Sequence, residues 1–156
     1  AEWPQGWMTL RPAEKDEEAA KQGLLFVVTH DGFSLQSMRL AQRSIEGEFK
    51  HTQKKLSVGM LPQEAAAILL DDIRADSNMV DFTIIENGPT ILAGSQGFKI
   101  KYAYRSKSGL RRQSVMYGCL DKGMLITLTF DAPQRHYFAL DLPTFEKVKD
   151  SLRWKS

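Results

Sequence analysis

The sequence predicts an α+β fold, in which helices pack on a mostly antiparallel sheet. The predicted elements run strands, helix, strands, helix, whereas a parallel sheet needs strands and helices that alternate. Apolar residues repeat at every second position in 80–84 and 98–104, and at every third or fourth position in 62–75. The chain has 156 residues, so we expect a single α+β domain over 1–156.

The first part of the chain predicts short strands. Residues 3–10 indicate a turn that leads into a strand. Residues 24–29 form a continuous apolar, β-branched run, which is typical of a buried strand. We expect 33–43 to pair back on that strand after an Asp-Gly turn. The polar segment 48–56 could be an amphipathic helical turn or a surface segment.

The clearest predicted helix begins at Pro62. Proline suits the first turn of a helix, where a backbone N–H has no partner in any case. The helix is expected to end near Ala75, because Asp-Ser-Asn follows. Its apolar stripe consists of Ala65, Ile68, Leu69 and Ile73, widened by Ala66 and Leu70.

A series of strands is predicted after this helix. Residues 87–89, Asn-Gly-Pro, are expected to turn the chain after a strand that starts at Val80. Three strands then follow over 98–105, 110–120 and 124–130, with short turns between them. Short turns join antiparallel neighbours, so these three strands predict a meander.

The end of the chain predicts a break and then a helix. Residues 131–133, Asp-Ala-Pro, are expected to end the last strand. Asp141 could cap a final helix, since a carboxylate accepts from free N–H groups at a helix start. Phe145, Val148 and Leu152 would lie on one face of that helix.

Several short motifs resemble those of a known family. They are GSQGFKIKY at 94–102, Gly118, LITLT at 125–129 with Ala-Pro at 132–133, Phe145 with 148–151, and WPQGW at 3–7. Through them the chain, best over 91–154, resembles the PsbP-like family, which includes Ran-binding Mog proteins and DcrB-type envelope lipoproteins. The resemblance implies an α+β sandwich and a non-enzymatic role in binding or assembly, in a bacterial envelope.

Composition sets weaker bounds on function. The net charge of +2 does not by itself indicate a nucleic-acid partner. The single cysteine excludes an internal disulfide, and no apolar run approaches the roughly 18 residues of a membrane span. The chain begins at Ala1 without methionine. The N-terminus is therefore either processed or truncated, and together with the family resemblance this start leads us to expect the loss of a targeting segment or a lipid-anchor cysteine, and a periplasmic or envelope location.

One basic segment is the candidate binding site. This segment lies between Gly97 and Gln113. Alternation places its Lys99, Lys101 and Arg105 side chains on the strand face opposite the apolar residues. Such a surface would attract an anionic partner, such as an acidic protein patch, lipid headgroups or nucleic acid. The alternative is a solvated outer face whose lysines prevent aggregation. The candidate residues are Lys99, Lys101, Arg105, Lys107, Arg111 and Arg112.

The sequence predicts no catalytic residue, metal or cofactor. The glycines at 94 and 97 precede a strand and lack a Walker lysine, so they indicate a turn or bulge rather than a phosphate loop. The three histidines, at 30, 51 and 136, lack metal-ligand spacing. Cys119 lies on a predicted strand and is expected to be a small buried side chain.

These patterns favour a binding or assembly domain that recognises a protein or an anionic surface. Two alternatives remain at this point. One is a small hydrolase that uses His136 or His30 with a nearby carboxylate. The other is a structural subunit of a larger complex, which would expose a contiguous apolar patch.

Overall fold

The computed structural model describes residues 8–10, 24–29, 37–45, 49, 52–57, 59–77, 79–134 and 137–151. The strands are β1 (Met8–Leu10), β2 (Leu24–Thr29), β3 (Ser37–Ser44), β4 (Val80–Leu92), β5 (Ser95–Arg105), β6 (Arg111–Asp121) and β7 (Met124–Pro133). The helices are α2 (Pro62–Ala75) and α3 (Tyr137–Ser151).

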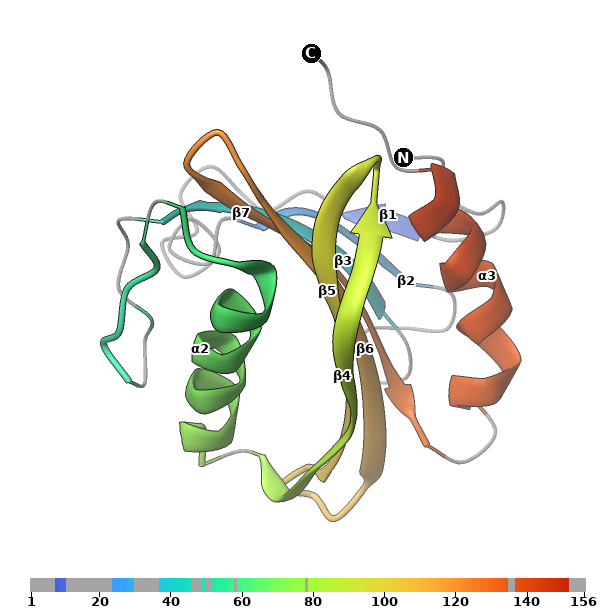
Figure 1. The fold of residues 1–156 in the computed structure, drawn as a ribbon. Helices are drawn as coiled ribbons and strands as arrows, with labels where there is room; N and C mark the ends of the chain where they lie inside the picture. The colour runs from blue at the N-terminus through green and yellow to red at the C-terminus, as the bar shows by residue number, and fades with distance from the viewer. Residues whose placement is uncertain are drawn as a thin grey trace.

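The strands form one seven-stranded sheet in the order β1-β2-β3-β7-β6-β5-β4, and every neighbouring pair is antiparallel. Figure 1 shows α2 on one face of this sheet and α3 on the other. The predicted α+β class is therefore confirmed, as are the predicted helix over 62–75 and the meander of β5, β6 and β7. We call the two sides of the sheet the α2 face and the α3 face.

Each face carries its own apolar core. On the α3 face, Phe130 stacks on Phe138 and Phe145 at centroid distances of 5.5 and 5.4 Å. On the α2 face, the small residues Ala65 and Ala66 let α2 approach the fully buried side chains of β5. The buried residues of the α2 face are Ile45, Phe49, Leu56, Ala65, Ala66, Leu69, Leu70, Phe98, Ile100, Tyr102 and Leu125.

The prediction of a turn at 87–89 is wrong. β4 extends as one strand from Val80 to Leu92, with register shifts at 80–83 and 84–86, and Pro89 pairs with Phe98 of β5. β4 is an edge strand that pairs with β5 alone among the described strands. A proline without an N–H is tolerated on an edge strand, because one side of such a strand has no neighbouring strand that needs the donor.

Two predicted boundaries near the C-terminus are also wrong. β7 does not break at 131–133 but continues to Pro133, because Asp131 pairs with Ser114 of β6. α3 begins at Tyr137 rather than at Asp141, which lies buried inside the helix. The earlier start places Phe138 on Phe130 in the core.

The first part of the chain follows the prediction where it is described. β2 spans 24–29 and β3 pairs back on it in antiparallel register. Within 49 and 52–57 no residue is assigned to a helix, but the amide of Gln53 donates to the carbonyl of Phe49 at 2.8 Å, which closes one turn, and Phe49 and Leu56 are buried. Residues 3–7, 14–21, 30–36 and 152 lie outside the described residues. Neither described helix is both long and apolar enough to cross a membrane.

Candidate functional site

The predicted basic residues separate into three places, and the first is beside α3. Lys99 and Lys101 lie on the α3 face of β5, where both are half-buried. The Lys99 ammonium lies 5.7 Å from the ring centroid of Tyr117, and the Lys101 ammonium 5.2 Å from that of Phe138. Lys99 also lies 3.6 Å from a carboxylate oxygen of Glu86. These contacts engage both ammonium groups within the fold.

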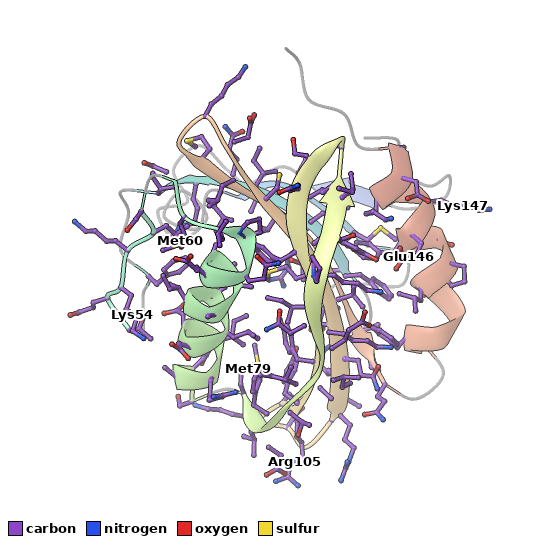
Figure 2. All side chains as sticks on the ribbon, in the orientation of Figure 1. Lys54, Met60, Met79, Arg105, Glu146 and Lys147 are labelled. Atoms are coloured by element: carbon purple, nitrogen blue, oxygen red, sulfur yellow. The ribbon has the colours of Figure 1, made fainter. Side chains whose placement is uncertain are left out.

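The second place is the hairpin tip, which we define as Arg105, Lys107, Arg111 and the turn 106–110 between β5 and β6. The amide of Ser106 donates to the carbonyl of Leu110 at 2.9 Å, so the turn is hydrogen-bonded. Lys107 and Arg111 are exposed. Arg105 lies 3.1 Å from Asp81, an exposed pair that contributes little to stability. The tip thus presents three cations at one end of the sheet, where Figure 2 labels Arg105.

The third place is the opposite face of β6. Arg112 is only 8% exposed and lies on the α2 face, because successive strand residues point to opposite faces. Its Nε donates a hydrogen bond to Oδ1 of Asp131 at 2.5 Å. The expectation that Arg112 belongs to the same basic surface as its neighbour Arg111 is therefore wrong.

Asp131 is the centre of a polar cluster that the sequence did not predict. Besides Arg112, the Tyr104 hydroxyl donates to Asp131 Oδ2 at 2.6 Å, and the Ser114 hydroxyl donates to the same oxygen. The Arg112 and Asp131 side chains are 10% and 18% exposed. A mostly buried carboxylate needs such donors, because it has left most of its water. Asp131 had been expected only to end a strand.

A hollow of about 420 Å³ opens beside this cluster on the α2 face, and we call it the polar hollow. Figure 2 places Met79, one of its lining residues, near the end of α2 and on the side of the molecule that carries Arg105. The lining comes from four strands, the hairpin turn and the segment after α2. It consists of Ser37, Arg39, Met79, Tyr102, Tyr104, Ser106, Ser108, Leu110, Arg112, Ser114, Thr129 and Asp131.

Arg39 adds an exposed cation to this hollow. It lies on β3 opposite Thr129 of β7. Among the described residues, no carboxylate forms an ion pair with it. Arg39 could not be predicted as a site residue from the sequence, since an isolated arginine on a short strand carries no spacing signal.

The hollow's tyrosines are hydrogen-bond donors rather than bases. Burial raises the pKa of Tyr102 to about 12. Burial, and then the nearby Asp131 carboxylate, raises the pKa of Tyr104 as well. Both hydroxyls therefore stay protonated at neutral pH and offer neutral O–H groups to a ligand or to Asp131.

We expect these tyrosines to make the protein sensitive to alkali. Tyrosines of the unfolded chain ionise near pH 10, whereas folded Tyr102 keeps its proton to about pH 12. The stability that the protonated tyrosine contributes is fully present below pH 10. It is lost as the pH rises from 10 through about 12, and each such tyrosine then lowers the free energy of unfolding by about 1.4 kcal/mol per pH unit. Urea unfolding at about pH 9, 10 and 11 should show that the free energy of unfolding falls less steeply with pH in Tyr102→Phe than in wild type. Equal slopes would contradict this assignment.

Candidate groups for catalysis are not assembled in the described structure. Cys119 is buried on β6, and burial, followed by the Asp121 charge, raises its thiol pKa to about 11, which leaves it as a thiol at neutral pH. The expected buried cysteine is confirmed. The histidines at 30, 51 and 136 lie outside the described residues. The described residues contain no group of three or more His, Cys, Asp or Glu side chains that could hold a metal.

The two glycines before β5 have structural roles. Gly94 adopts φ +83° in the two-residue turn between β4 and β5, a conformation that favours glycine. Gly97 pairs with Cys119, and a Cβ there would lie 2.3 Å from the carbonyl oxygen of Gly118. The interpretation of this segment as a hairpin entrance is thus confirmed, with close strand approach as the reason for Gly97.

Comparisons with known proteins identify the fold. No protein-family model matches the sequence, and no curated protein matches it. Among solved structures, cyanobacterial PsbP (CyanoP) from Synechocystis sp. PCC 6803 aligns with a TM-score of 0.62 at 14% identity, over 96% of this chain and 82% of its own. LpqN of Mycobacterium tuberculosis, involved in cell envelope biogenesis, aligns with a TM-score of 0.58 at 14% identity, over 97% of this chain and 79% of its own. A Pseudomonas aeruginosa protein of unknown function aligns with a TM-score of 0.57 at 10% identity, over 100% of this chain and 88% of its own. The predicted PsbP-like fold is therefore confirmed.

Proposed function

We propose that this chain, which has the PsbP-like fold, is a non-enzymatic binding domain that recognises an acidic protein surface through the hairpin tip. The observation that carries the proposal is the pair of exposed cations Lys107 and Arg111, held on a hydrogen-bonded turn. Clustered charge of one sign speeds encounter with a partner of opposite sign. Arg105 adds a third, partly neutralised cation.

The other predicted basic residues have secondary places in this proposal. Lys99 and Lys101 already contact rings beside α3, and Arg112 holds Asp131. They would add to the overall positive field rather than touch the partner. We therefore propose that the partner contacts the exposed cations at the end of the hairpin, because removing water from exposed cations costs less than from buried ones.

We also propose a bacterial envelope or periplasmic setting. The fold similarity to LpqN, a protein involved in cell envelope biogenesis, supports this setting. The sequence resemblance to envelope lipoproteins points the same way. A lipid anchor in the precursor stays a prediction, which mass spectrometry of the native protein would test.

Charge reversal at the tip tests the proposed function. Wild type and a Lys107→Glu/Arg111→Glu variant would be used to capture partners from an envelope extract at about 50 and about 300 mM salt. We expect one acidic protein to bind wild type at low salt, to be lost at high salt and to be lost with the variant. Anionic and neutral lipid vesicles, tested in parallel, would separate a membrane from a protein partner.

The matched control is Lys55→Glu/Lys147→Glu, which reverses two exposed lysines outside the tip that form no ion pair among the described residues. It makes the same change in net charge but should retain the partner. Equal loss with both variants would mean that net charge alone attracts the partner, and the tip would not be the site.

An apolar contact is the second candidate, and it corresponds to the structural-subunit alternative. Leu61 and Ile91 are 60% and 61% exposed and line one hollow together with Pro62 and Pro89. Exposed apolar side chains that adjoin one another favour a protein contact. A partner that stays bound at high salt and to the tip variant would favour this surface over the tip.

A further inference from the structure

We propose that the polar hollow is a binding site for a single carboxylate carried on a small apolar body. The cations of the hollow, Arg39 and Arg112, are not those of the hairpin tip, although the turn 106–110 also contributes to the lining of the hollow. The proposed site therefore goes beyond the proposed function, and it can hold or fail independently of it.

The charges that line the hollow favour a ligand with one negative charge. Arg39 and Arg112 supply two positive charges, and Asp131 supplies one negative charge that Arg112 Nε already contacts at 2.5 Å. Arg39 has no ion-pair partner among the described carboxylates, so the described lining residues carry one more positive than negative charge. A dianion such as phosphate would bring its second charge close to Asp131, where like charges repel.

Polar donors surround this surplus charge. The Ser37 side chain is 1% exposed and lines the hollow, and its hydroxyl has no hydrogen-bond partner among the described residues. A buried hydroxyl without a partner carries a desolvation cost that a bound acceptor would remove. Tyr102 adds a second O–H, which is protonated at neutral pH as in any tyrosine and stays so well into alkali, because burial raises its pKa.

The shape of the groups favours a carboxylate. A guanidinium presents two parallel N–H groups that match the two oxygens of a planar carboxylate. Met79 and Leu110 provide apolar lining next to the tyrosine rings, so the ligand would carry a short apolar body. At about 420 Å³, the hollow lies in the size range of small-molecule sites.

The carboxylate could come from a free organic acid or from the C-terminus of a peptide. Hexanoate represents the first source, and N-acetyl-leucine represents the second. N-acetyl-leucinamide is the matched probe without the charge, and inorganic phosphate is the dianion. Each would be titrated into the ¹⁵N-labelled protein, with NMR signals of Ser37, Arg39, Tyr102 and Ser114 as the readout.

We expect saturable shifts of these signals with one or both carboxylates, and weaker binding of the amide and of phosphate. Saturation by hexanoate alone would assign a free acid, and saturation by N-acetyl-leucine would assign a peptide terminus. Arg39→Ala should weaken binding by about tenfold or more, the usual effect of losing a charged hydrogen bond. Arg39→Lys should be intermediate, because lysine keeps the charge without the planar fork.

Arg111→Ala is the control, since it removes an exposed arginine of the adjacent hairpin tip that does not line the hollow. It should bind the carboxylates as wild type does, even though it weakens capture by the tip. The inference is overturned if no probe saturates, if the amide binds as well as the acid, if phosphate binds more tightly, or if Arg39→Ala has no effect.

Discussion

Replacing Asp131 with alanine is expected to lower the free energy of unfolding by about 3 to 5 kcal/mol, the usual cost of removing one partner of a buried ion pair. The carboxylate accepts hydrogen bonds from Arg112, Tyr104 and Ser114, three residues on two neighbouring strands. Its removal leaves the Arg112 charge mostly buried and deprives two hydroxyls of their acceptor. Urea unfolding of the variant and of wild type would measure the difference.

The control for this prediction is Asp71→Ala. Asp71 lies 2.9 Å from the Lys54 ammonium, but these side chains are 46% and 52% exposed. Water screens such a pair, so its loss should cost at most about 1 kcal/mol. If the two variants lost the same stability, Asp131 would be an ordinary surface carboxylate and the account of the polar cluster would be wrong.

A double variant separates the ion pair from the packing around it. Asp131→Leu with Arg112→Met replaces both charges by apolar side chains of similar size. Buried pairs replaced in this way are often as stable as the originals. We therefore expect the double variant to be more stable than Asp131→Ala. A double variant no more stable than Asp131→Ala would indicate that the Arg112 charge left behind by Asp131→Ala is not the main source of the loss.

The fold could be predicted from local patterns because each element carries its own period. α2 began and ended at the predicted residues, since Pro62 marks its start and polar loop residues follow its end. The turn predicted at 87–89 failed because the same Asn-Gly-Pro residues can be accommodated on a sheet edge, and only the sheet order shows that β4 is an edge.

The candidate site could be predicted only in part. Alternation correctly placed Lys99 and Lys101 opposite Phe98, but it could not show that α3 packs on that face beside them. The polar cluster depends on the register of β6 against β7, which sets Ser114 opposite Asp131. These two residues are 17 positions apart in the chain, and no local spacing rule connects them.

Gly118→Ala is expected to cost about 3 kcal/mol, at the upper end of the usual effect of overpacking a core. A Cβ at this position would lie 2.2 Å from Cζ of Phe98 and 2.8 Å from two further ring atoms. The Phe98 ring is fully buried under α2, so it has no free space into which to move. Gly88→Ala is the control, because nothing lies within 4 Å of its Cβ and its φ is not positive, and we expect a change within about 0.5 kcal/mol.

The physical cause can be tested by making room for the new methyl group. Phe98→Leu removes the ring atoms that would clash, at a cost of its own in buried apolar area. If the clash is the cause, the two substitutions together should cost at least about 1 kcal/mol less than the sum of their separate effects. Additive losses would show that the ring is not the obstacle, and that the narrow approach of β5 to β6 at Gly97 and Gly118 restricts the backbone itself.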